Sequence, residues 1–143
     1  MMIPMYTAHA TATGGRAGHV ESDDGTLSLD LAMPKEMGGN GSGTNPEQLF
    51  AAGYAACFHS ARQFVAGQSK TDVSGSRVAG HVSIGENDKG PGFKLGVVLD
   101  VTVPSLSQQE AEKLAEQTHQ VCPYSNATRG NIDVELNVTG GGA

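Results

Sequence analysis

Residues 44–61 carry the longest helical pattern in the chain and contain one of its two cysteines. Asn45 stands where a helix N-cap is expected, and Pro46 follows at the first helical position, where a missing N–H is tolerated. Apolar residues then recur at three- and four-residue spacing, namely Leu49, Phe50, Gly53, Tyr54, Cys57, Phe58 and Ala61. This spacing predicts a helix over residues 46–66 with one buried face.

Strands are predicted on both sides of this helix. Alternating side chains and turn residues indicate strands over 5–13, 16–22, 26–33, 77–86, 92–103 and 131–138. A capping box, Ser107 to Glu110, opens a second helix over 108–122. Because strands come in runs joined by hairpin turns, the order strand-strand-strand-helix-strand-strand-helix-strand predicts an α+β fold with antiparallel sheets.

Length and charge limit the possible classes of protein. The 143 residues suit a single domain over 1–143, ordered from about 5 to 138, with a flexible glycine-rich tail over 139–143. The net charge is −6 and the basic residues are scattered, so no nucleic-acid partner is expected. No run approaches the roughly 20 apolar residues of a membrane span. The N-terminus shows no secretory pattern, so we expect a cytoplasmic protein without membrane contact.

The two cysteines, Cys57 and Cys122, form no CxxC motif. In a cytosolic protein such a pair is more often redox-active or metal-binding than a structural disulfide. His119 precedes Cys122 by three residues, but a second pair of ligands is not evident, so no metal site is predicted.

The predicted positions of the two thiols favour different chemistry. Cys57 lies in the middle of a helix, where the helix dipole is weak and burial raises a thiol pKa, so a reactive Cys57 needs a cation from elsewhere. A guanidinium at about 4 Å would supply roughly 4 kcal/mol. Cys122 lies at a helix C-terminus before Pro123, which suits a resolving thiol. From these residues alone, an inert core cysteine is the commoner interpretation of Cys57.

Longer motifs surround both cysteines. Residues 44–58 resemble the first cysteine motif of the organic hydroperoxide resistance (Ohr) branch of the OsmC/Ohr family, and residues 121–131 resemble its second. The segment from Tyr6 to Arg16 is also similar. The resemblance runs from about residue 5 to 138.

The resemblance implies a thiol-dependent peroxidase that reduces organic hydroperoxides. Cys57 would attack the peroxide and become a sulfenic acid, and Cys122 would resolve it as a disulfide. Arg16 would lie against the thiolate, and Glu47 would hold Arg16. The resemblance also implies an intertwined homodimer with sites at the subunit interface, no cofactor in the protein, and an external dithiol reductant, a dihydrolipoyl group carried on a protein.

Physical reasoning adds to these roles. A carboxylate close to a thiolate would raise the thiol pKa, so Glu47 is useful if it grips Arg16 and aims it at sulfur. Glu47 precedes Cys57 by about 15 Å of helix, too far for direct contact. Arg62 and Lys94 are rival cations. Four aromatic residues are predicted to line an entrance for alkyl chains: Phe50, Tyr54, Phe58 and Phe93.

Two alternative functions remain open at this stage. One is an OsmC-type peroxidase with a different peroxide preference. The other is a non-catalytic redox sensor in which Cys57 and Cys122 form a switch. Repeated turnover would separate a peroxidase from a sensor, which oxidises once.

Overall fold

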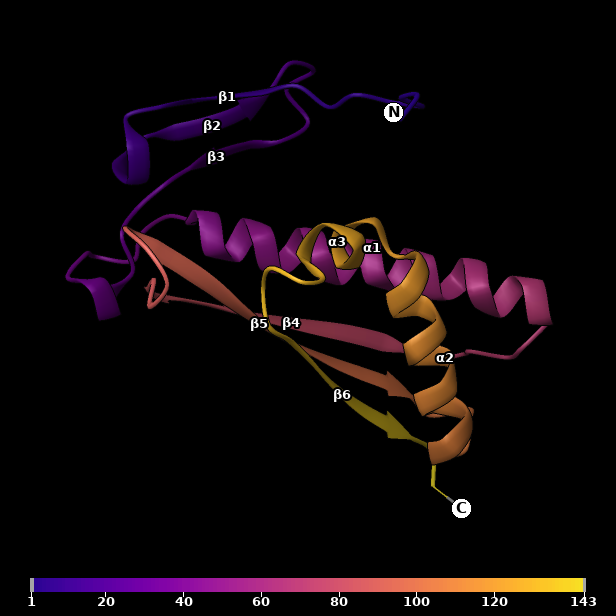
Figure 1. The fold of residues 1–143 in the computed structure, drawn as a ribbon. Helices are drawn as coiled ribbons and strands as arrows, with labels where there is room; N and C mark the ends of the chain where they lie inside the picture. The colour runs from indigo at the N-terminus through magenta and orange to yellow at the C-terminus, as the bar shows by residue number, and fades with distance from the viewer. Residues whose placement is uncertain (1, 143) are drawn as a thin grey trace. The chain divides into compact units, whose positions relative to one another are not determined.

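The computed structural model describes residues 2–142, and the chain divides into two compact units, one ending at Leu49 and the other beginning at Phe50 (Figure 1). The expectation of a single domain over 1–143 stays a prediction. The α+β class is confirmed, because strands come in runs separated by helices, in the order β1-β2-β3-α1-β4-β5-α2-α3-β6.

The first unit contains a small antiparallel sheet of three strands, β1 (Ala10–Thr13), β2 (His19–Ser22) and β3 (Ser28–Asp30). Each strand is shorter than predicted. Two 3-10 turns accompany the sheet, Gly15–Ala17 between β1 and β2, and Lys35–Met37 after β3. Leu27, Leu29 and Leu31 alternate with polar residues, a pattern that predicts one face turned to a core. Leu31 is buried, whereas Leu27 and Leu29 are each 37% exposed, so the pattern is confirmed for Leu31 only.

Helix α1 (Pro46–Ser69) begins where the sequence predicts and runs three residues further than expected. The Asn45 side chain caps its start by accepting the Gln48 N–H at 2.8 Å. Its buried residues follow at four-residue intervals, Tyr54, Phe58, Arg62 and Ala66. One stripe of the helix is therefore committed to the interior.

The sheet of the second unit has the order β4 (Arg77–Glu86), β5 (Phe93–Val103), β6 (Val134–Gly140). The β4–β5 hairpin is antiparallel as predicted. The prediction of purely antiparallel pairing is wrong for β6, which pairs parallel to β5. The reason is the connection between them, which contains α2 (Gln108–Val121) and α3 (Pro123–Thr128) and is long enough for a crossover.

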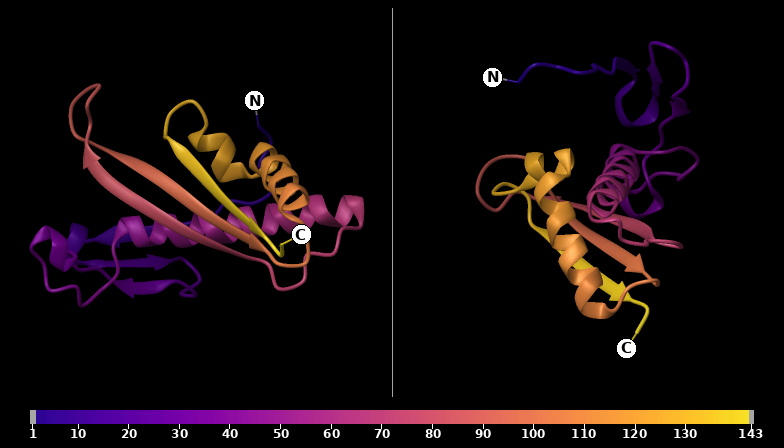
Figure 2. Two further views of the ribbon diagram at one scale, coloured as in Figure 1. Left: turned by 90° about the horizontal axis from the view of Figure 1, so that it is seen from below. Right: turned by 90° about the vertical axis from the view of Figure 1, so that its right-hand side faces the viewer.

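Both long helices cover the same face of this sheet (Figure 2). Alternate β5 residues form one side of the core: Val97, Leu99, Val101 and Val103. Tyr54 and Phe58 of α1 and Leu114 of α2 belong to the same cluster. The opposite face is polar, since His81 and Asp100 lie 2.8 Å apart on neighbouring strands. Helices therefore cover one face of this sheet, and the other face carries polar side chains.

The C-terminal segment is more regular than predicted. Strand β6 continues to Gly140, and the Gly141 N–H donates to the Leu106 carbonyl at 2.7 Å. The predicted tail from residue 139 thus begins no earlier than residue 142, and Ala143 lies outside the described residues. Among helices of residues 2–142, none has the length and apolar character needed to cross a membrane.

Candidate active site

The structure brings the two cysteines together. Cys57 lies midway along α1, and Cys122 lies between α2 and α3, at the N-cap position of α3. Their Sγ atoms are 3.7 Å apart although the residues are 65 positions apart in sequence. Cys57 is partly exposed, whereas Cys122 is completely buried. A disulfide bond is about 2.05 Å long, so only a small movement separates this pair of thiols from a covalent bond.

The surroundings of Cys57 act on its thiol in opposite directions. Burial raises the pKa of Cys57, as expected for its place on an apolar helix face. Hydrogen bonding from the backbone of Tyr124 lowers this pKa, while the neighbouring Cys122 raises it. Tyr124 is thus a site residue that sequence analysis missed.

Sequence analysis missed Tyr124 because it ended the second helix before Pro123 and predicted no further element before the strand at residue 131. Proline also suits the first position of a helix, and Cys122–Pro123 is the N-cap and first residue of α3. The preference of proline for the first position of a helix is the sequence signal that could have predicted α3, and with it the position of the Tyr124 backbone.

Aromatic rings hold the start of α3 against α1. The ring of Tyr124 lies 5.9 Å from that of Phe50 and 5.6 Å from that of Tyr54, measured between centroids. Gly53 permits this approach, because a Cβ atom there would lie 2.7 Å from the Tyr124 hydroxyl. The absence of a side chain at position 53 therefore lets the α3 segment carrying the Tyr124 N–H sit close to α1.

A cavity of about 400 Å³ opens beside the more exposed thiol. Besides Cys57, it is lined by Ser60, Ala61, Phe64, Val121 and Pro123. Phe64 and Val121 are 61% and 44% exposed, so apolar surface is available next to sulfur. The cavity can accept a small apolar group within reach of Cys57.

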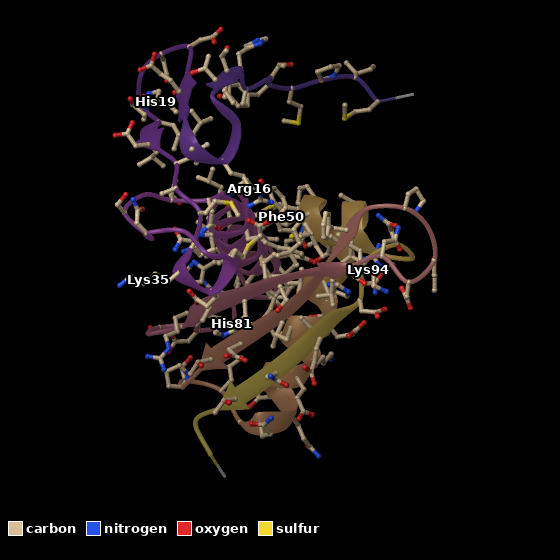
Figure 3. All side chains as sticks on the ribbon, turned by 90° about the vertical axis from the view of Figure 1, so that its left-hand side faces the viewer. Arg16, His19, Lys35, Phe50, His81 and Lys94 are labelled. Atoms are coloured by element: carbon tan, nitrogen blue, oxygen red, sulfur yellow. The ribbon has the colours of Figure 1, made fainter. Side chains whose placement is uncertain are left out.

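The four aromatic residues predicted to contact substrate do not line this cavity. Tyr54 and Phe58 are completely buried in the core, which leaves them no surface to offer. Phe93 is 71% exposed and lines a different cavity, with Lys94 and Ile132. Phe50, labelled in Figure 3, is half-buried and packs against the Tyr124 ring. A substrate role for these four stays a prediction that the cavity does not support.

Arg16 and Glu47, both in the first unit, form a bidentate ion pair. Arg16 Nη1 donates to Glu47 Oε2 at 2.9 Å, and Nη2 donates to Oε1 at 2.6 Å. Arg16, labelled in Figure 3, follows Gly14 and Gly15, whose φ angles of 73° and 58° favour glycine. The hydrogen bond to Arg16 lowers the pKa of Glu47, and that to Glu47 raises the pKa of Arg16. The contact implied by the resemblance exists, while its catalytic role stays a prediction.

The rival cations have other surroundings. Lys94 pairs with Asp88. Arg62 is only 2% exposed, and its Nη2 lies 3.3 Å from His59 Nε2, whereas its Nε and Nη1 have no hydrogen-bond partner among residues 2–142. Burial lowers the pKa of Arg62. Neither residue lines the cavity beside Cys57.

His119, the residue with metal-like spacing to Cys122, instead lies 2.8 Å from the Ser125 hydroxyl through its Nδ1 atom. Residues 2–142 contain no group of three or more histidine, cysteine, aspartate or glutamate side chains that could hold a metal ion.

Comparisons with known proteins agree on one family. Residues 39–137 match the sequence model of the OsmC family, described as OsmC-like protein. The chain is 53% identical over 135 residues to an organic hydroperoxide resistance protein of Xanthomonas axonopodis pv. citri, covering 94% of each chain. It is 48% identical over 136 residues to the organic hydroperoxide resistance protein OhrB of Bacillus subtilis, covering 95% of this chain and 99% of the relative.

A solved structure gives the same result. The crystal structure of an organic hydroperoxide resistance protein OsmC from Legionella pneumophila superposes with a TM-score of 0.91 at 54% identity, covering 96% of this chain and 99% of that one.

We predict that Glu47→Gln destabilises the protein in a pH-dependent way. The pKa of Glu47 is lowered from its ordinary value of 4.5, so its stabilisation is complete above that pH and is lost as the pH falls through the lower folded-state pKa. Urea unfolding at pH 7 should show a loss of about 1–2 kcal/mol, and the difference should shrink as the pH falls below the lowered folded-state pKa of Glu47. The exposed Glu36 serves as control, and an equal effect of Glu36→Gln would contradict the assignment.

Proposed function

The chain belongs to the OsmC family, and on this basis we propose that it is a thiol-dependent peroxidase that reduces organic hydroperoxides to alcohols. The names of its relatives, organic hydroperoxide resistance proteins at about half identity over nearly the full length, support this substrate class. The observation that carries the proposal is the thiol pair, with Sγ atoms 3.7 Å apart beside an apolar cavity.

The unequal exposure of the two thiols supports a division of roles. Cys57 lines the cavity, so it can meet a peroxide from solution. Cys122 is completely buried, so its accessible partner is Cys57. Cys57 is therefore assigned as the attacking thiol and Cys122 as the resolving thiol.

The proposed reaction balances in three steps. The Cys57 thiolate attacks the distal peroxide oxygen, the O–O bond breaks, and the alkoxide takes a proton and leaves as alcohol, with Cys57 oxidised to sulfenic acid. The Cys122 sulfur then attacks that of Cys57, forming the disulfide and releasing the hydroxyl group as water. An external dithiol, which we propose is a protein-bound dihydrolipoyl group, restores both thiols by exchange and is itself oxidised. No cofactor is required.

Arg16 is proposed to supply the positive charge that a buried thiolate needs. Burial raises the pKa of Cys57, and one N–H donor is set against that effect. A guanidinium near the sulfur favours the thiolate, and the Glu47 carboxylate orients Arg16 through two hydrogen bonds. We also propose that the protein acts in the cytoplasm as an intertwined homodimer with sites at the subunit interface.

The first test is steady-state reduction of an alkyl hydroperoxide with dihydrolipoamide as donor. We expect many turnovers per protein, a loss of at least a thousandfold in Cys57→Ser, and in Cys122→Ser a single rapid turnover that leaves a trappable sulfenic acid. A monothiol donor should support much slower turnover. Oxidation that stops after one equivalent in the wild-type protein would instead identify a redox sensor with the same thiol pair.

A second test measures the proposed cation in the Cys122→Ser background. Replacing Arg16 by alanine should raise the pKa of Cys57 by roughly 1–3 pH units, because an opposite charge is lost. The readout is the pH dependence of iodoacetamide alkylation. Arg77, an exposed arginine of β4, is the matched control. An unchanged profile in Arg16→Ala would remove Arg16 from the mechanism.

A third test compares two phenylalanines as substrate contacts. Phe64 lines the cavity beside Cys57, whereas Phe93 was predicted from sequence and lines another cavity. We expect Phe64→Ala to lower kcat/KM for a bulky aryl hydroperoxide about tenfold relative to hydrogen peroxide. A selective loss in Phe93→Ala alone would favour the sequence-based prediction over the cavity.

A further inference from the structure

A cluster of buried hydroxyl groups joins α1 to α3 next to the thiols. The Tyr54 hydroxyl lies 2.7 Å from Ser125 Oγ and 3.2 Å from Thr128 Oγ1. His119 of α2 extends the cluster, with Nδ1 2.8 Å from Ser125 Oγ. We call Tyr54, Ser125, Thr128 and His119 the hydroxyl clamp.

The three hydroxyl groups of the clamp are closed to solvent, whereas His119 is half-buried. Tyr54 and Ser125 have no exposed surface, and Thr128 is 2% exposed. A buried hydroxyl without a partner is strongly unfavourable, so these groups favour the one arrangement in which all are bonded. Thr128 completes it by donating to the Ser125 carbonyl at 3.2 Å. The clamp therefore specifies the position of α3 on α1 more sharply than apolar packing alone.

The clamp and the thiol pair share the same two segments. Tyr54 lies three residues before Cys57 on α1, so both occupy one face one turn apart. Ser125 lies three residues after Cys122, and Tyr124, whose backbone lowers the pKa of Cys57, lies between them. Anchoring Ser125 therefore places both the second sulfur and the backbone donor against Cys57.

A further contact ties α3 to α2. Arg129 Nη2 donates to the His119 carbonyl, so the residue just after α3 is held to the helix that carries a clamp member. The segment from His119 to Arg129 is thus fixed at both ends, with Cys122 and Tyr124 between them. The positions of Cys122 and Tyr124 are therefore restrained from both ends of this segment.

We propose that Tyr54 and Ser125 are positioning residues, which act through their hydrogen bond to hold Cys122 and the Tyr124 backbone beside Cys57. This inference deepens the proposed function, since it names the residues that prepare the thiol pair for disulfide formation. The Tyr54 hydroxyl performs this role, and its ring forms part of the core. Tyr54→Phe separates the two contributions.

The experiment uses the reduced, folded protein and needs no peroxide. In the Cys122→Ser background, Tyr54→Phe should shift the pH profile of Cys57 alkylation upward by roughly 0.5–1 pH unit, because the Tyr124 N–H is no longer held at the sulfur. With both cysteines present, equilibration against a dithiothreitol redox buffer should show a disulfide reduced about three- to tenfold more readily than in the wild type, because the thiols are less well aligned.

Thr118→Val is the matched control. Thr118 is a completely buried hydroxyl of α2 that donates to the Leu114 carbonyl of its own helix, so its loss removes a buried hydrogen bond outside the clamp. This variant should lower stability without moving either readout. Ser125→Ala should reproduce the shifts of Tyr54→Phe, and it replaces that variant if circular dichroism shows that Tyr54→Phe is unfolded.

The outcomes separate the two proposals. An unchanged pH profile and redox equilibrium in folded Tyr54→Phe or Ser125→Ala would overturn the positioning role, and so would equal shifts in Thr118→Val. Absence of peroxidase turnover in the wild-type protein would overturn the proposed function, but it would leave these two measurements and their interpretation intact.

Discussion

The contact between α1 and the start of α3 is the interaction on which the site depends. It sets the Cys57 and Cys122 sulfur atoms 3.7 Å apart and places the Tyr124 backbone where it lowers the pKa of Cys57. Gly53 leaves room for the approach, and the Tyr54–Ser125 hydrogen bond fixes its register. Close packing and paired buried hydroxyls together leave few alternative arrangements, which is the condition for a prepared pair of reacting groups.

Placing a thiol on a buried helix face has an electrostatic consequence. Burial disfavours the thiolate, and a single N–H donor offsets only part of that effect. The proposed remedy is a guanidinium whose own orientation is set by a carboxylate, and the Arg16–Glu47 pair has the geometry for it. The same burial has a benefit, because it keeps Cys122 away from solvent oxidants and leaves Cys57 as its partner.

Sequence patterns located most elements but not every contact. The Asn45 cap, the Ser107 capping box and the β4–β5 hairpin were predictable, because each depends on neighbours in the chain. The parallel β6 was not, since its pairing follows from a crossover whose path is set by packing. The predicted aromatic entrance shows the same limit, because Tyr54 and Phe58 share the core face, whereas Ala61 and Phe64 line the cavity.

The sequence by itself determined the family, the identity of the two thiols and the candidate partners Arg16 and Glu47, because motifs and local hydrogen-bonding patterns are written in consecutive residues. Only the tertiary structure decided that Cys122 is the buried thiol, that the Tyr124 backbone faces Cys57, and that the Tyr54 hydroxyl belongs to a clamp. These properties depend on distances between segments 65–71 residues apart in sequence, which periodicity along one helix cannot encode.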